Sequence, residues 1–358
     1  MIPERTNVPT PFPLIRNKVE QKTAIEQKPA IAAVAPARPE IKPVSQLPDK
    51  AFKAALQLCA LSVIAIVVLL IYELVTQSHL SLAKFGIRFL FTRTWDPLNG
   101  VLGALPFIFG TIVSSLLALI MAVPLAVGSG IFLTEMCPRA LRGAISFLIE
   151  LLAAIPSVIY GLWAIFILAP LMRKYVEPFL AQIDTSMTAH LGWSTGLFSG
   201  PAYGVGMLTA GVVLAVMIIP IIASITREVI TAVPRAQREA VLALGGTRWE
   251  MIRVGVLRNA RVGIFGAIIL GLGRALGETM AVTMVIGNRA DIARSLFAPA
   301  YTLASVIANE FSEAIDDLHI SALMEIGLVL LIVTMAINAL AMLLVWSITR
   351  GQPKGSHA

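Results

Sequence analysis

Six long apolar stretches divide the chain, and polar loops separate them. The stretches fall near residues 53–75, 107–133, 143–171, 205–226, 262–287 and 321–348. A helix needs about 20 apolar residues to cross a hydrocarbon layer about 30 Å thick. The pattern therefore predicts an all-α integral membrane protein with six transmembrane helices.

The composition supports this class. Hydrophobic residues make up 57% of the chain and charged residues only 14%, whereas a soluble domain has about a quarter of its residues charged. The spacing of the two cysteines and four histidines does not suggest a metal site. We therefore exclude a soluble protein, and we expect membrane lipid, but no metal and no nucleic acid, as a binding partner.

The distribution of lysine and arginine predicts the orientation. With the N-terminus inside, 20 of the 28 basic residues lie on the cytoplasmic side, seven lie outside, and Arg274 lies within a span. Loops on the cytoplasmic side carry the excess of positive charge in membrane proteins. We therefore expect both termini in the cytoplasm.

The chain has four predicted parts. Residues 1–50 are rich in Pro, Ala, Gln and Lys and are predicted to form a disordered cytoplasmic tail. Residues 51–105 form the first transmembrane helix and an outer loop, 106–348 form a five-helix core with a cytoplasmic loop at 227–261, and 349–358 form a second tail. The outer loops have roughly 30 residues each, too few for a ligand-binding domain, so a separate protein should deliver any scarce solute.

Prolines interrupt three of the apolar stretches, at Pro124, Pro156 and Pro220. A proline inside a span frees a carbonyl and bends or breaks the helix. Ser157 and Tyr160 follow one such position and are candidates to line a polar passage. The alternatives are a merely curved, packed bundle and hydroxyls that bond to their own helix.

Arg274 and Glu278 are the most informative residues of the chain, because they lie inside the fifth apolar stretch. A helix starting near residue 262 would place them about 18 and 24 Å along its axis, on one face and within reach of each other. Charges at such depth are costly and usually mark function. The pair is a structural ion bridge, a binding site for a tetrahedral oxyanion, or, through Glu278, a proton relay.

Neighbouring residues extend this hypothesis. Glu150 and Glu325 are further acids within apolar stretches, and either is a candidate to neutralise Arg274. Gly273 and Gly277 are four residues apart, a spacing that lets another helix approach closely.

A short helix is predicted in the cytoplasmic loop. Pro234 and the pair Gly245-Gly246 bracket about ten residues with start and stop signals of a helix. A helix of this length is unstable alone, so it must rest on something. The small residues Ala240 and Ala243 leave room for close docking to another protein; the alternative is an amphipathic connector on the membrane surface.

The segment Glu239-Ala240-Val with Gly245 resembles the EAA loop of ABC importer permeases. That resemblance implies a coupling helix that docks on an ATPase, with Arg238, Glu239, Ala240 and Gly245 as coupling residues. The chain departs from the pattern in two places. Arg258 stands where proline is usual and Gly255 replaces a larger apolar residue, which weakens the expected break before the fifth helix.

Several other motifs are similar to those of the permeases of phosphate ABC importers, and the likeness covers roughly residues 50–350. They are Gly271–Thr283, Ile286–Asn288, Ile155–Gly161, Ala304–Phe311 and Leu323–Leu328. The resemblance implies a type I ABC importer permease in the bacterial inner membrane, working by alternating access with Arg274 and Glu278 on the phosphate route.

The resemblance also implies partners: a PstA-like permease, two PstB-like ATPase subunits and a PstS-like periplasmic binding protein. The chain has no Gly-x-x-x-x-Gly-Lys-[Ser/Thr] loop, so ATP and Mg²⁺ should bind to the ATPase, and we expect neither a cofactor nor catalytic residues here. Alternatives are a permease for another oxyanion or a phosphonate, an ion-coupled phosphate carrier, and a signalling or scaffold protein.

Overall fold

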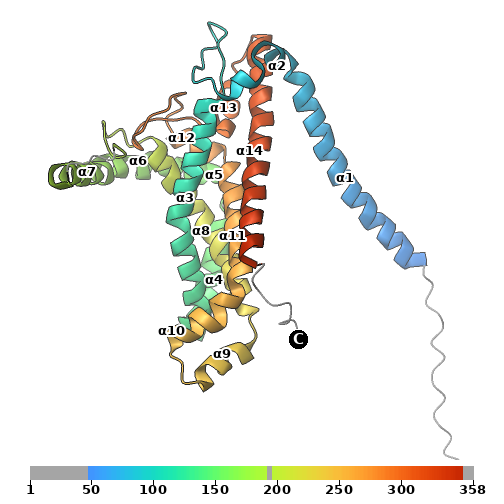
Figure 1. The fold of residues 1–358 in the computed structure, drawn as a ribbon, viewed down its shortest axis with the longest axis vertical. Coiled ribbons are helices and arrows are strands. Elements are labelled where there is room, and N and C mark those ends of the chain that lie inside the picture. The colour runs from blue at the N-terminus through green and yellow to red at the C-terminus, as the bar shows by residue number, and fades with distance from the viewer. Residues whose placement is uncertain (1–46, 192–195, 350–358) are drawn as a thin grey trace, which may run out of the picture. The chain divides into compact units, whose positions relative to one another are not determined.

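The computed structural model describes residues 47–191 and 196–349 (Figure 1). Most of the predicted N-terminal tail and residues 350–358 lie outside this part. The first helix begins at Leu47, inside the range expected for the tail. Contacts divide the chain after Val63, and the helix bundle belongs to the unit from Ile64 onward.

The described residues form helices and no named strand. The long helices are α1 (Leu47–Gln77), α3 (Leu105–Ile131), α4 (Arg139–Ala154), α7 (Glu177–Leu191), α8 (Met207–Thr231), α11 (Arg258–Leu276) and α14 (Asp317–Thr349). The short ones are α2 (His79–Phe85), α5 (Ser157–Trp163), α6 (Ala169–Leu171), α9 (Arg235–Ala243), α10 (Arg248–Glu250), α12 (Met280–Val285) and α13 (Leu303–Glu310). A 3₁₀ helix, η1, spans Gly86–Leu90, and π-helical segments occur at η2 (Phe132–Met136), η3 (Ala164–Leu168), η4 (Met172–Val176) and η5 (Met251–Leu257).

Six helical segments of the described chain are long and apolar enough to cross a membrane, which confirms the predicted class. They run over Lys50–Gln77, Leu105–Met136, Ser157–His190, Met207–Thr231, Arg248–Leu276 and Asp317–Ser347.

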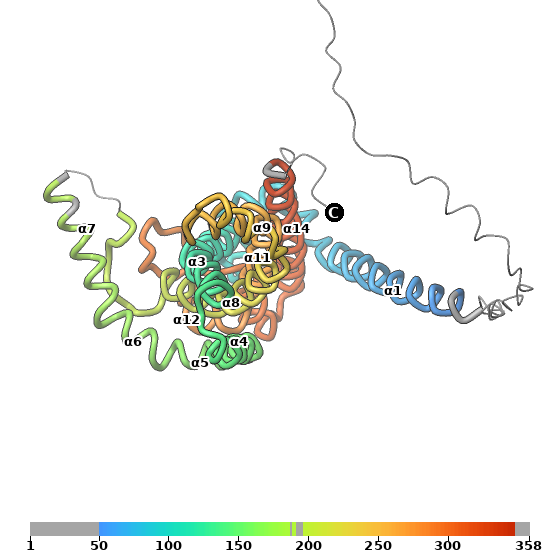
Figure 2. Tube along the Cα trace, turned by 90° about the horizontal axis from the view of Figure 1, so that it is seen from below, coloured from blue at the N-terminus to red at the C-terminus, as the bar shows by residue number. Residues whose placement is uncertain are grey.

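Helix α8 forms the centre of the bundle. It packs against α3, α4, α11 and α12, which surround it in the view along the bundle (Figure 2). On α3, Ala118, Ala122 and Ala126 recur every four residues and are fully buried against this helix. Small side chains let two backbones approach closely, and such contact drives helix association where the surrounding lipid is itself apolar.

A second cluster fixes the opposite end of α3. The rings of Trp95 and Tyr301 both pack edge-on against Phe107, near the start of α3. The Leu303 backbone N–H donates to the Thr111 hydroxyl over 2.9 Å, so the start of α13 is bonded to α3. The loop between α12 and α14 is thereby anchored to the bundle.

The three prolines behave differently. Helices α3 and α8 continue through Pro124 and Pro220, so the breaks predicted there are wrong. At Pro156 the helix does stop, because Ile155 adopts the extended conformation that a following proline favours. The Tyr160 hydroxyl donates to the Leu152 carbonyl across this break over 2.8 Å.

The predicted third span, 143–171, is therefore not one helix. Helix α4 ends before Pro156, and a new helix runs from Ser157 to Leu191 with π-helical segments inside it. Its last part, α7, is seen nearly end-on in Figure 1 and so runs across the direction of α3 and α8.

The predicted fifth span, 262–287, also differs. One continuous helix runs from Arg248 to Leu276, then the chain leaves the helix at Gly277 and resumes at Met280 as α12. Glycine is the weakest ordinary helix former, and Gly271, Gly273 and Gly277 are concentrated at this end. The expected single helix is thus broken immediately beside Glu278.

Gly161 joins the two interrupted helices, because α5 lies against α12 at this residue. A Cβ on Gly161 would lie 3.1 Å from the Ala281 Cα, and the Met284 side chain is closer still.

We predict that Gly161→Val destabilises the protein by about 1–3 kcal/mol, the usual cost of overpacking. Thermal unfolding in detergent measures this, and Gly128→Val is the control because nothing lies within 4 Å of a Cβ there. Equal melting temperatures for the two variants would contradict the packing argument.

Candidate functional site

Arg274 lies near the middle depth of the bundle. Three residues earlier, Gly271 packs against Ile218 and Ile222, which lie midway along α8. Arg274 follows by about 4.5 Å along the helix axis, in the last turn of α11. The structure therefore places its charge far from either end of α8.

The pair with Glu278 is formed, but not on one helical face as expected. Glu278 lies beyond the end of α11, and one of its oxygens accepts a hydrogen bond from the Ala281 N–H over 3.3 Å. The other lies 3.7 Å from the Arg274 guanidinium, which is longer than a hydrogen bond. The Glu278 side chain is 5% exposed and that of Arg274 48%. The carboxylate is thus fixed, whereas the guanidinium makes no hydrogen bond within the described chain.

The Arg274 side chain is about half exposed, so the core of this chain does not enclose it. Ala267 and Gly271, seven and three residues earlier on neighbouring turns, are buried, so Arg274 lies at the edge of the packed face of α11. A Cβ on Gly273 would meet nothing within 4 Å. Because an arginine at this depth is costly in lipid, this open face requires a second protein or a polar passage against it.

Two helix interruptions lie close to this position. Through Gly161, the segment after the Pro156 break packs on α12, the segment after the Gly277 break. Broken helices at mid-depth are a recurrent feature of substrate sites in transporters, because their freed backbone groups face a polar cavity. The candidate residues Ser157 and Glu278 each lie at such an interruption.

The other predicted acids lie elsewhere. Glu150 forms a 2.8 Å ion pair with Arg227, and its side chain is more than half exposed. Glu325 is buried one turn after Ser321, on the face of α14 that packs against α2. Neither residue has Arg274 as a partner in this structure, so the expected neutralisation of Arg274 by Glu150 or Glu325 is not observed.

The loop between α8 and α11 contains the predicted short helix, α9. Pro234 immediately precedes it, and Gly245 follows it with φ +82°, a left-handed conformation that favours glycine. Glu239 and Ala240 are exposed, as are the apolar residues Leu242 and Leu244, the latter 89%. Exposed leucines on so short a helix indicate a surface that another protein covers.

Helix α9 rests on the beginning of the fifth span. A Cβ on Gly255 would lie 3.1 Å from the Gln237 carbonyl oxygen and 3.3 Å from the Val241 side chain. The glycine that departs from the usual pattern therefore makes room for α9. The sequence predicted only a weak break before the fifth helix, at Arg258. In the structure the helix continues through this residue without a break.

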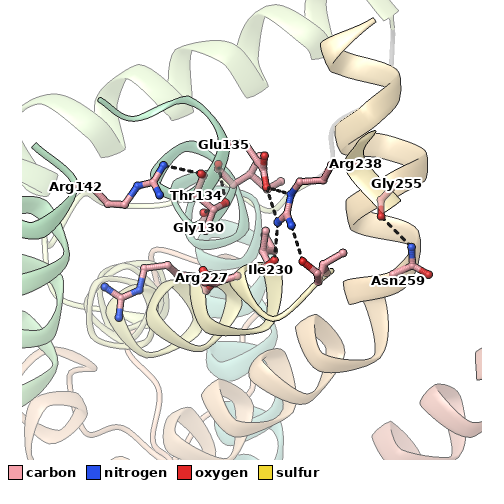
Figure 3. Close-up of polar contacts among 12 residues, drawn as sticks. Gly130, Thr134, Glu135, Arg142, Arg227, Ile230, Arg238, Gly255 and Asn259 are labelled. Atoms are coloured by element: carbon pink, nitrogen blue, oxygen red, sulfur yellow. Dashed lines mark hydrogen bonds and ion pairs between the residues drawn. The ribbon is translucent and has the colours of Figure 1, made fainter. Parts of the chain in front are cut away.

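Arg238 points inward from α9 and joins three elements (Figure 3). Its guanidinium donates to Glu135 of η2 over 2.9 and 3.1 Å and to the Ile230 carbonyl of α8 over 2.8 Å. It also donates to the Val233 carbonyl. The Arg238 and Glu135 side chains are only 18% and 9% exposed. We call these four residues the Arg238 junction; it fastens α9 to the ends of α3 and α8.

Comparison with known proteins gives the class of this fold. Residues 122–351 match the family described as binding-protein-dependent transport system inner membrane component. A bacterial ABC transporter for import of the acidic polysaccharide alginate shares the fold at a TM-score of 0.56, with 16% identity, covering 84% of this chain and 98% of that one. The class is therefore that of type I ABC importer permeases.

The relatives are more specific. The phosphate transport system permease protein PstC of Mesorhizobium japonicum is 45% identical over 82% of this chain and 89% of its own length. PstC of Haemophilus influenzae is 45% identical over 83% of this chain and 93% of its own. The chain thus belongs to the PstC family of inner-membrane permeases, and it is a multi-pass protein of the bacterial inner membrane.

The partners of Arg238 and Glu150 were not predicted from the sequence. Glu135 ends the second apolar stretch and Arg227 ends the fourth, and both are ordinary charges at the end of a span. For Glu135 the signal was that it lies at the same predicted membrane face as Arg238, which it binds; for Arg227 there was none, because its partner Glu150 was predicted to lie inside a span.

We predict that Arg238→Gln destabilises the protein by on the order of 3 kcal/mol, because it leaves the mostly buried Glu135 unpaired. Thermal unfolding of the purified protein is the measurement. Arg253→Gln, at an exposed arginine of the same loop, should leave the melting temperature unchanged. An equal loss in both variants would show that the Arg238 junction is not a stabilising contact.

Proposed function

We propose that this chain is the permease subunit of an ATP-driven importer that moves inorganic phosphate into the cytoplasm by alternating access. The observation that carries the proposal is the identity of 45% with PstC permeases over most of the chain. The position of Arg274 supports it, because an anion crossing the apolar bundle needs a cation at that depth.

Arg274 binds the phosphate in this proposal. A guanidinium offers two parallel N–H groups to two oxygens of a tetrahedral anion. In the structure its donors are free of hydrogen bonds from the described chain, and Glu278 neutralises it from 3.7 Å. That separation favours anion binding over a structural ion bridge, in which the two groups would be directly bonded. Glu278 orients the guanidinium between transport cycles.

The route lies between this permease and a second, PstA-like one. The open face of α11 supports this arrangement, since Gly273 and Gly277 leave room for a close approach beside Arg274. A PstS-like binding protein delivers phosphate from outside. Two PstB-like subunits bind ATP and Mg²⁺, and one of them docks on the outer surface of α9.

Coupling passes through the Arg238 junction. Glu239, Ala240 and Gly245 meet the ATPase, whereas Arg238 turns the other way and binds Glu135. A displacement of α9 is thereby carried to the ends of α3 and α8, and α8 packs directly on α11. Arg238 is a positioning residue of this movement and does not contact the ATPase.

We predict that Arg274→Gln lowers ATP-driven phosphate uptake by about 10- to 100-fold, the effect of losing charge-assisted hydrogen bonds to the anion. The measurement is uptake of labelled phosphate by proteoliposomes with the complete importer. The variant should still assemble, because Arg274 makes no hydrogen bond in the described chain and Glu278 keeps its hydrogen bond from the Ala281 N–H. Normal uptake by an assembled variant would refute the assignment.

The same assay separates the alternative mechanisms. An ATP-driven importer shows no uptake when a proton gradient replaces ATP, whereas an ion-coupled carrier does. Competition by arsenate, sulfate and phosphonates gives the selectivity among anions.

We predict that Glu239→Lys reduces co-purification of the ATPase with the permease, because the substitution reverses a charge on the exposed face of α9. Arg253→Gln serves as the matched control in the same loop. Unchanged co-purification and uptake for Glu239→Lys would show that the ATPase docks elsewhere.

A further inference from the structure

A polar cavity of about 390 Å³ lies beside α9 and the Arg238 junction. Residues from η2 at the end of α3, from the end of α8, from the start of α4 and from α9 line this cavity, which is open to solvent. Its lining consists of Thr134, Glu135, Arg139, Arg142, Thr231, Val233, Arg235, Arg238 and Glu239.

Positive charge predominates in this cavity. Four arginines face two glutamates, and Glu135 is already paired with Arg238. Arg139 and Arg235 are exposed and have no ion pair or hydrogen bond from their side chains among the residues that the structure describes. Their guanidinium groups converge on one space from two elements, α4 and α9.

Arg142 adds a further positive charge to the lining. One terminal nitrogen donates to the Thr134 carbonyl over 2.7 Å, which fixes the side chain at the cavity wall (Figure 3). Its Nε is buried and has no hydrogen-bond partner in the described chain. This N–H is out of reach of solvent, so what Arg142 adds to the cavity that it lines is its positive charge.

We propose that this cavity is a second anion site, which binds a phosphate group. The phosphate group comes either from free inorganic phosphate or from the headgroup of an anionic phospholipid at the membrane edge. Arginines recognise phosphate oxygens through paired N–H groups, and basic pockets between helices at the cytoplasmic face bind such headgroups. The volume is within the range of small-molecule sites.

The site is separate from the transport route. It lies at the α9 end of the bundle, whereas Arg274 lies at the level of the middle of α8. A phosphate group bound by Arg139 of α4 and Arg235 of α9 links these two elements beside the Arg238 junction. Occupancy therefore strengthens the contact between α9 and the membrane helices.

The test compares the complete importer, purified without its periplasmic binding protein and stripped of lipid, in three forms. They are the wild type, the double variant Arg139→Gln with Arg235→Gln, and the control Arg248→Gln with Arg253→Gln, which removes the same charge from exposed positions outside the cavity. One arm measures bound labelled inorganic phosphate by equilibrium dialysis. The other adds phosphatidylglycerol to the stripped importer and counts the bound molecules by native mass spectrometry.

We expect the wild type and the control to bind one more phosphate group per permease than the cavity variant in one of the two arms, with affinity at least about tenfold weaker in the variant. The arm that shows this difference identifies the source. Equal binding by all three forms in both arms would overturn the proposal, as would an equal loss in the control. Gel filtration verifies that each form is assembled.

The result is independent of the transport route. Arg274→Gln should retain binding in the cavity even when uptake is lost. If Arg274 is shown not to bind the transported phosphate, the proposal for this cavity is unaffected. If the cavity binds no phosphate group, the assignment of Arg274 is likewise unaffected.

Discussion

A guanidinium at the middle of an apolar bundle requires a polar environment, and the remainder of the transport route depends on that requirement. Arg274 receives only part of that environment from its own chain. Glu278 neutralises it from 3.7 Å, and the half-exposed side chain lies next to Gly273, where the other helices leave open space. Lipid cannot complete the site at acceptable cost. The missing part must come from a second permease, from water and from the anion itself.

The break after Leu276 makes this arrangement possible. If the fifth span were one helix, Glu278 would lie one turn above Arg274 and the two would form an ordinary ion pair on its surface. Because the helix ends, Glu278 is instead fixed by the N–H of Ala281 and buried against α12. The carboxylate is then held by the protein, while the guanidinium stays available to a ligand.

At the α9 end of the bundle, a short helix must transmit movement to the membrane helices. A nine-residue helix cannot transmit a displacement unless it is attached to the helices that move. Gly255 lets α9 lie against the fifth span, and Arg238 bonds it to η2 and α8. The outer surface of α9 stays free for a partner. One face of α9 thus contacts the membrane helices, and the other is available to the partner.

Much of this was predictable from the sequence, since length and hydropathy determine the number of spans and the short-helix signals around Pro234 and Gly245 are local. The proline effects were not predictable, because whether Pro124 or Pro156 ends a helix depends on the packing around it. The partners of Arg238 and Glu150 were also out of reach, since they come from elements distant in sequence. The extra space at Gly255 has a function only once α9 is seen to lie on it.

The most direct test of the central claim is the chemical accessibility of position 274 in the assembled importer. Arg274→Cys, in a chain whose Cys59 and Cys137 are replaced by serine, is treated with a charged, membrane-impermeant thiol reagent with and without ATP. We predict labelling in at least one nucleotide state, at a rate that differs with and without ATP. An unlabelled cysteine in every state would mean that position 274 never faces a water-filled passage, and would contradict the account.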